Sequence, residues 1–235
     1  MTEAQVYRVR VLETVPHRSR AVSARFERPE GFEYAAGQWV LVTLEANGEE
    51  LAHPLSLSSS PTEPFLEVTK GMTGHPFAEA FRQLAPGDLL TVQGPFGSFA
   101  IPDGEVDAVL VSGGIGVTPL RSMVRFVTDA GLPARILLIY SARTEDDLVF
   151  GGEFEDVEKT NLRFRLLPTL TRQGPEWTGR TGRVDRPFLD REVPDALSRT
   201  YLVSGPPAMV ESVTACLEEM GVPAGQVRRE IFAGY

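Results

Sequence analysis

The chain has 235 residues, of which 42% are apolar and 23% charged, and its formal net charge is −9. Such a composition is typical of one large globular domain or two small ones, and the negative charge disfavours binding to nucleic acid or an anionic membrane. No apolar run approaches the roughly twenty residues that span a bilayer, and the N-terminus MTEAQVYRVR has no signal-peptide core, so we expect a cytoplasmic protein. One cysteine and three scattered histidines predict no disulfide framework, no four-thiolate cluster and no metal site.

Arginines near the N-terminus are the local exception to this acidity: Arg8, Arg10, Arg18, Arg20, Arg25 and Arg28. The simpler interpretation is the solvated face of a strand. The alternative is a docking patch for an acidic partner.

Residues 1–102 alternate apolar and polar side chains over short stretches, as strands of an antiparallel sheet do. Strands are expected at 7–11, 39–44, 55–57, 65–68 and 89–92, with Pro or Gly between them. One helix is expected over 77–84, ending at Pro86-Gly87-Asp88. The pattern predicts a small antiparallel β-barrel or sandwich as the first domain.

Residues 103–235 follow a different pattern, in which strands and helices alternate. Strands are expected at 109–112, 135–140, 164–168, 201–204 and 227–231, and helices at 119–130 and 207–220. Such alternation predicts an α/β domain with a Rossmann-like parallel sheet, covered on both faces, that binds ligands at the carboxyl ends of its strands.

The segment AVLVSGGIGVTP, residues 108–119, leads from a strand through a glycine-rich turn into a helix. Gly113, Gly114 and Gly116 permit positive φ and a close backbone approach, and Thr118 with Pro119 can open a helix whose free N–H groups attract phosphate. The turn therefore predicts a dinucleotide site, although tight strand-to-helix turns also need glycine for steric reasons alone.

A second polar segment, HPLSLSSSP at residues 53–61, carries four hydroxyl groups within six positions. They could bind phosphate or flavin ring atoms, or they could serve only the local turn.

The order of the motifs along the chain resembles the ferredoxin–NADP reductase family of flavoprotein reductases. The motifs are GQWV at 37–40, HPLSLSSSP at 53–61, EVTKG at 67–71, LAPGD at 84–88, GPFGSF at 94–99, GGIGVTP at 113–119, SGPPAMV at 204–210 and EIF at 230–232. The resemblance implies a flavin-binding barrel and a nicotinamide-nucleotide domain. It also implies hydride transfer from NADPH or NADH to FAD, with FMN less favoured, and electron transfer onward to a separate redox protein.

In the barrel, the resemblance implies that Ser56 lies beside the reactive nitrogen of the flavin. Leu55 takes the place of the family's stacking tyrosine, and His53 that of its phosphate-binding arginine. A similar histidine-proline start, here His53-Pro54, occurs in relatives that use FAD. The other flavin-binding residues that the resemblance implies are Glu67, Thr69, Lys70, Gly71, Thr73, Phe77 and Ala78.

In the nucleotide domain, the resemblance places Glu230 and Ser204 near the nicotinamide and Phe232 or the final Tyr235 against the flavin. Further coenzyme contacts are implied for Gly114, Gly116, Thr118, Gly205 and Pro206. Arg143, Thr171 and Arg172 resemble the residues that contact a 2′-phosphate, which favours NADPH, whereas Glu145, Asp146 and Asp147 in the same loop favour NADH.

Two other functions fit the same residues. The first is an NAD(P)H:flavin or ferric reductase, in which flavin is a substrate, and His53 and Leu55 modestly favour it. The second is a noncatalytic nucleotide-binding subunit of a larger redox complex.

Overall fold

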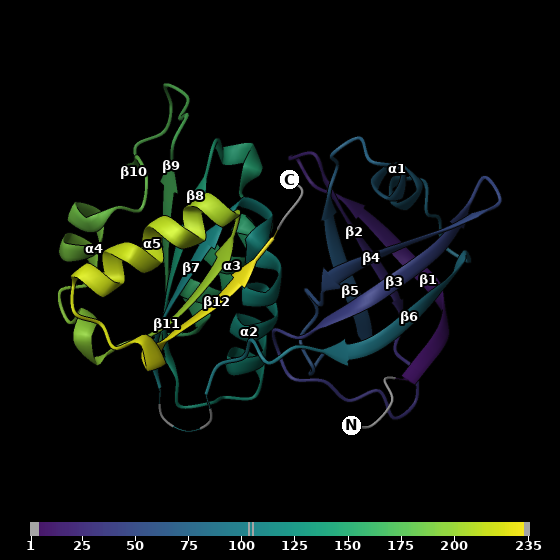
Figure 1. Cartoon of the computed structure of the whole chain (residues 1–235), viewed down its shortest axis with the longest axis horizontal. Helices are drawn as coiled ribbons and strands as arrows, with labels where there is room; N and C mark the ends of the chain where they lie inside the picture. The colour runs from purple at the N-terminus through teal and green to yellow at the C-terminus, as the bar shows by residue number, and fades with distance from the viewer. Residues whose placement is uncertain (1–4, 103, 105, 233–235) are drawn as a thin grey trace.

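Two six-stranded sheets stand side by side in the computed structural model, which describes residues 5–102, 104 and 106–232 (Figure 1). The first sheet comes from the N-terminal part of the chain and the second from the C-terminal part. This arrangement confirms the predicted fold class, an antiparallel barrel-like sheet followed by a parallel sheet with helices.

The first sheet is antiparallel, with strand order β4-β3-β6-β1-β2-β5. Its strands are β1 (Gln5–Pro16), β2 (Ala21–Glu27), β3 (Trp39–Ala46), β4 (Glu49–Ser56), β5 (Phe65–Gly71) and β6 (Leu89–Phe96). Alternate side chains such as Val40, Val42 and Val92 fill its interior. A bridge between Leu57 and Val68 joins the ends of the sheet, which therefore curls into a half-barrel, and α1 (Pro76–Arg82) packs on it.

The second sheet is parallel, with strand order β10-β9-β8-β7-β11-β12. Its strands are β7 (Asp107–Gly113), β8 (Arg135–Ala142), β9 (Phe164–Leu170), β10 (Arg180–Thr181), β11 (Thr200–Gly205) and β12 (Val227–Ile231). The helices α2 (Val117–Asp129) and α3 (Gly151–Thr160) pack on one face, and α4 (Arg186–Glu192) and α5 (Pro207–Glu219) on the other. Short 3₁₀ turns complete the unit: η1 (Gly114–Gly116), η2 (Glu145–Asp147), η3 (Ala196–Ser198) and η4 (Ala224–Gln226).

Several elements differ from the sequence predictions for identifiable reasons. The strand predicted at 55–57 is the end of β4, whose earlier residues carry Glu, Ala and Pro on the solvent side and so hide the alternation. The helix α3 was not predicted because it buries only Phe154 and Val157. The short α4 depends on its cap, in which the Asp185 carboxylate accepts a hydrogen bond from the Phe188 N–H.

Helix α2 joins the two sheets because its apolar side chains also contact the half-barrel. Ala21, Ala36 and Phe99 of the half-barrel belong to the same buried cluster as Leu120 and Met123 of α2. A side chain at Gly37 would lie 2.1 Å from the Phe99 carbonyl oxygen and 2.4 Å from Cε of Met123, so only glycine fits there. The two units therefore share one packed interface.

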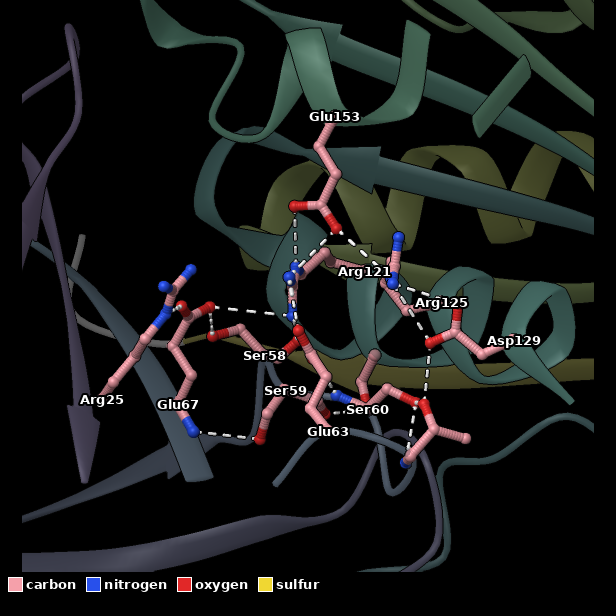
Figure 2. A network of polar contacts seen from close by, with 12 residues as sticks. Arg25, Ser58, Ser59, Ser60, Glu63, Glu67, Arg121, Arg125, Asp129 and Glu153 are labelled. Atoms are coloured by element: carbon pink, nitrogen blue, oxygen red, sulfur yellow. Dashed lines mark hydrogen bonds and ion pairs between the residues drawn. The ribbon is translucent and has the colours of Figure 1, made fainter. Parts of the chain in front are cut away.

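A buried arginine stands at the centre of this interface (Figure 2). Arg121 of α2 is 3% exposed, and its guanidinium donates to the Ser58 carbonyl oxygen at 2.8 Å and to both oxygens of Glu63 at 2.7 and 3.1 Å. It also donates to Glu153 of α3 at 3.0 Å. Burial lowers the pKa of Arg121, but the hydrogen bond to Glu63 and the charges of Glu67 and Glu153 outweigh that effect and hold the pKa above its ordinary value.

The same network accounts for three of the four hydroxyls in the serine-rich segment. Ser58 Oγ donates to Glu67, Ser59 Oγ accepts from the Glu67 N–H, and Ser60 Oγ bonds to Thr62. These three side chains are fully buried and serve the turn and the interface (Figure 2). Only Ser56 is left to face the second sheet.

We expect Arg121→Met to lower the free energy of unfolding by about 3–5 kcal/mol, because it leaves buried carboxylates without their partner. Arg125→Met, on the same helix, removes partly exposed pairs with Asp129 and Glu153 but leaves Glu153 paired with Arg121, so it should cost less than about 1 kcal/mol. Chemical denaturation of the two variants measures the difference. Equal losses would show that the Arg121 network does not hold the units together.

Candidate active site

A cleft of about 610 Å³ separates the half-barrel from the carboxyl ends of the parallel strands. A doubly wound sheet binds its ligands at this edge. The half-barrel supplies Ser19, Arg20, Ala21, Gly71, Met72 and Thr73. The parallel-sheet unit supplies Gly113, Gly114, Ile115, Ser141, Ala142, Arg143, Asp147, Val149, Thr171, Pro206, Met209 and Phe232.

Glycines form the floor of the cleft, where two strand-end turns press against each other. A Cβ on Gly116 would lie 2.5 Å from the Ser204 carbonyl oxygen, and one on Gly113 would lie 2.9 Å from both Pro206 and Met209. Gly114 has a φ of +54° and no neighbour within 4 Å of a Cβ, so its backbone is open to the cleft. Gly113 and Gly116 are thus required for packing, and Gly114 offers its backbone to a ligand. Thr118, in the first turn of α2, is buried.

Ser56 and Glu230 come together from opposite units, although 174 positions separate them in the chain. Ser56 ends β4, Glu230 lies near the end of β12, and Ser56 Oγ donates to Glu230 Oε2 at 3.4 Å. Burial raises the pKa of Glu230 to about 7, with the hydrogen bond from Ser56 opposing the rise. A carboxyl group at the junction of the units therefore titrates near neutral pH.

Ser204 stands beside Glu230 in the strand register, so the three candidate reactive side chains lie on adjacent elements. The hydroxyls of Ser204 and of its other neighbour Ser112 are fully buried, and neither has a hydrogen-bond partner among the described residues. Unpartnered buried hydroxyls are costly, and a polar ligand that reaches them would remove that cost.

The segment 53–55 packs against α1. The His53 ring lies 5.1 Å from the Phe77 ring, and burial together with the charges of Lys70 and His75 lowers the pKa of His53. Leu55 is buried in the half-barrel core, as are Phe77 and Ala78, whereas Pro54 is exposed. The lowered pKa favours the neutral form of the His53 ring.

Among the residues of EVTKG, Glu67 and Thr69 have structural partners. The Glu67 carboxylate is 1% exposed and accepts from Arg25 Nε at 2.7 Å, and Thr69 Oγ1 bonds to Ser23 and Ser58. Lys70 is buried, and burial lowers its pKa. Gly71 and Thr73 line the cleft, and Thr73 Oγ1 is buried with no partner among the described residues.

Arg143, Thr171 and Arg172 lie together at the ends of β8 and β9. The Arg143 side chain is 68% exposed and pairs with Asp147 at 3.3 Å, and its carbonyl oxygen accepts from the Arg172 N–H at 2.7 Å. At the other end of the cleft, Phe232 donates its N–H to the Gly205 carbonyl oxygen beside Pro206. Tyr235 lies outside the described residues.

The cleft also contains residues that the sequence analysis did not assign to a coenzyme or flavin site. Ser19 and Arg20 come from the turn before β2, a strand that was not predicted, and Met72, Val149 and Met209 carry no chemical signal. Within the arginine-rich stretch, Arg25 binds two glutamates and Arg28 donates to backbone carbonyl oxygens.

The described residues are 5–102, 104 and 106–232. This part of the chain holds no group of three potential metal ligands and no helix long and apolar enough to cross a membrane.

The structure combines a doubly wound sheet, with a cleft lined by glycines at its strand ends, and a curled antiparallel sheet that faces this cleft. This combination defines the class of two-domain reductases that bind a flavin and a nicotinamide nucleotide. Residues 7–101 match the family described as the oxidoreductase FAD-binding domain, and residues 110–215 match the oxidoreductase NAD-binding domain. The chain belongs to the ferredoxin–NADP reductase family. It is an NAD(P)H-dependent flavoprotein oxidoreductase with FAD as its flavin.

Among its relatives, ferredoxin–NADP reductase B of Sorangium cellulosum is 33% identical, over 98% of this chain and 99% of the relative. The glycine betaine monooxygenase reductase subunit of Chromohalobacter salexigens is 32% identical, but the matched part is only 58% of its length. Among solved structures, an Amycolatopsis cytochrome P450 reductase is 25% identical with a TM-score of 0.85, over 97% of this chain and 71% of that one. A ferredoxin–NADP reductase from Neisseria gonorrhoeae with bound FAD and NADP shares the fold, with 21% identity and a TM-score of 0.81 over 97% and 99% of the two chains.

We expect Glu230 to set the pH dependence of flavin reduction. Hydride donation leaves a positive charge on the nicotinamide, which a carboxylate stabilises, so kcat/KM should rise with pH through a pKa of about 7. Glu230→Gln should remove this step and hold the rate near the low-pH level. Stopped-flow measurement of flavin bleaching between pH 5.5 and 8.5 tests the expectation, and a step that persists in the variant would contradict it.

We also expect Ser56→Ala to keep its FAD and to reduce it roughly tenfold to thousandfold more slowly, the scale of one or two hydrogen bonds formed during reaction. Ser60→Ala is the matched control, because Ser60 belongs to the same segment but bonds only within its turn. An unchanged rate in Ser56→Ala would mean that this serine is structural.

Proposed function

We propose that the protein takes hydride from NADPH onto FAD held by the half-barrel and passes the electrons to a separate ferredoxin or oxygenase-type protein. The observation that carries the proposal is the contact between Ser56 and Glu230, which joins the two units at one point. The names of the relatives support a protein acceptor, since one is a ferredoxin–NADP reductase and others are reductase components of monooxygenases.

The half-barrel residues fit a flavin dinucleotide. Bound flavin accepts a hydride and releases electrons one or two at a time. In our proposal His53, Pro54, Leu55, Ser56 and Lys70 lie along the ring system, and the turn at 71–79 with Thr73 binds the phosphates. The unpartnered Thr73 hydroxyl supports this placement, because a phosphate oxygen would satisfy it.

In the second unit we propose that Gly114, Gly205 and Pro206 bind the coenzyme backbone, and that Ser204 and Glu230 hold the nicotinamide. Phe232, which lines the cleft, is proposed to pack on the flavin. We set the boundary between a FAD-binding and an NAD(P)-binding domain at residues 102 and 103. We also propose a cytoplasmic location, since NAD(P)H is an intracellular coenzyme.

One observation favours a second function, in which flavin is a substrate that binds and leaves. Leu55 is buried in the core and has no ring to stack on a flavin, and the lowered pKa of His53 disfavours a positive charge near the flavin. A noncatalytic subunit would bind nucleotide and reduce nothing.

Release of flavin from the purified protein distinguishes these functions. We expect about one FAD per chain after denaturation, following the one flavin site proposed, and ferredoxin reduction by NADPH that does not depend on added flavin. Flavin-free protein whose activity saturates with added flavin would instead support flavin as substrate. Absence of any flavin binding would overturn the proposal.

We expect Arg143 and Arg172 to select NADPH over NADH. Each exposed contact between guanidinium and phosphate contributes about 1–2 kcal/mol, so the double alanine variant should lose roughly a hundredfold of the preference. Asp147→Asn is the informative control, because it frees Arg143 from its ion pair and should not weaken NADPH binding. Steady-state kinetics with both coenzymes provide the measurement, and an unchanged coenzyme ratio would show that other residues contact the ribose.

A further inference from the structure

The turn between β1 and β2 reaches into the coenzyme cleft, although it belongs to the half-barrel. Ser19 and Arg20 line the cleft, and the Arg20 carbonyl oxygen accepts from the Met72 N–H at 2.6 Å. Ala21, the next residue, is buried in the cluster that contains Val117 of α2. The turn therefore lies at the interface between the two units, and its residues share the cleft with the glycine turn.

A second set of contacts holds the beginning of this turn. The His17 ring lies 5.0 Å from the Phe150 ring, and His17 Nε2 bonds to Ser23 Oγ at 2.7 Å. Phe150 in turn lies under the Arg121 guanidinium, at 5.2 Å. Phe150 has a φ of +63°, a conformation that bulky side chains rarely adopt, so the surrounding contacts must maintain it. These contacts hold the turn in place without involving the side chain of Arg20.

The charges in the cleft do not balance. Its charged lining residues are Arg20, Arg143 and Asp147, and Arg143 is paired with Asp147. The Arg20 guanidinium is exposed and has no carboxylate partner among residues 5–102, 104 and 106–232. Beside it, Ser19 Oγ is buried with no hydrogen-bond partner in the same part of the chain. An unpaired cation and an unused hydroxyl together suit an anionic group.

The position of Arg20 along the cleft indicates which anionic group it would bind. Arg143 and Thr171 end β8 and β9 on one side of the glycine turn, and Pro206 and Phe232 follow β11 and β12 on the other. A coenzyme with its adenosine near Arg143 and its nicotinamide near Phe232 has its diphosphate in the middle, above Gly113 and Gly114. Arg20 lines the same cleft as Gly113 and Gly114.

We propose that Arg20 and Ser19 form a diphosphate subsite, which holds the diphosphate of the nicotinamide coenzyme from the half-barrel side. The inference rests on the proposed function and deepens it. The coenzyme would be held by both units, with the glycine turn beneath and the arginine above. Because NADPH and NADH share the diphosphate, the subsite contributes affinity without selecting between them.

The test uses three variants of the holoenzyme: Arg20→Gln, Ser19→Ala and the matched control Arg18→Gln. Arg18 is an exposed arginine of the same turn that does not line the cleft. Flavin difference spectra with the unreactive oxidised coenzymes give the Kd values. Arg20→Gln should weaken NADP⁺ and NAD⁺ by the same factor, roughly tenfold to a hundredfold, and Ser19→Ala by a few-fold in the same direction. Arg18→Gln should stay within about twofold, and FAD content should be unchanged in all three.

Three results would overturn the subsite. Weaker binding of NADP⁺ alone would mean that Arg20 contacts the 2′-phosphate. Loss of FAD with normal coenzyme affinity would place Arg20 on the flavin diphosphate. Unchanged affinities and FAD content would mean that Arg20 binds no ligand. Calorimetric titration with inorganic pyrophosphate separates this proposal from the proposed function. Pyrophosphate that binds the wild type and not Arg20→Gln would support the subsite even in a protein that reduces no flavin, and equal pyrophosphate binding by both would count against it.

Discussion

The geometry of the site depends on one buried cation. Arg121 lies on the nucleotide-binding unit, and two of its carboxylate neighbours, Glu63 and Glu67, belong to the half-barrel. A guanidinium removed from water is tolerated only when its charge and its N–H groups are satisfied. These partners surround Arg121 only when the two units are packed together, so the ionic network fixes their relative position as well as contributing to the interface. The cleft and the pair of Ser56 and Glu230 both follow from that position.

The polar residues near the interface form two groups, those that have structural partners and those that lack them. Ser58, Ser59, Glu67 and Thr69 bond to one another or to Arg121 and Arg25, and their hydrogen-bonding capacity is largely used. Other polar groups are less satisfied: the hydroxyls of Thr73, Ser112 and Ser204 lack partners among the described residues, and Glu230 sits where burial raises its pKa. Native proteins rarely leave such groups without a role, so their lack of partners supports the proposal that ligands contact them.

Much of the fold could be predicted from periodicity, because the parallel strands are apolar on both faces and α2 has a clear apolar stripe. The elements that were not predicted include β2, α3, α4 and the two-residue β10, which bury few apolar side chains or alternate weakly. Glycine patterns and motif order indicated the cleft, but the roles of individual side chains depend on tertiary neighbours. The sequence could not distinguish Ser56, which faces Glu230, from Ser58, which serves the interface, since both belong to one serine-rich run. Arg20 likewise had the same local signal as Arg18.

The central claim is that the two units, fixed by their interface, pass a hydride from coenzyme to bound flavin. The most direct measurement is anaerobic single-turnover mixing of the FAD-loaded protein with NADPH, repeated with NADPH carrying deuterium at the transferred position of the nicotinamide ring. The account predicts that the flavin absorbance bleaches in both experiments and more slowly with the deuterated coenzyme. Flavin that stays oxidised although NADPH binds would contradict it.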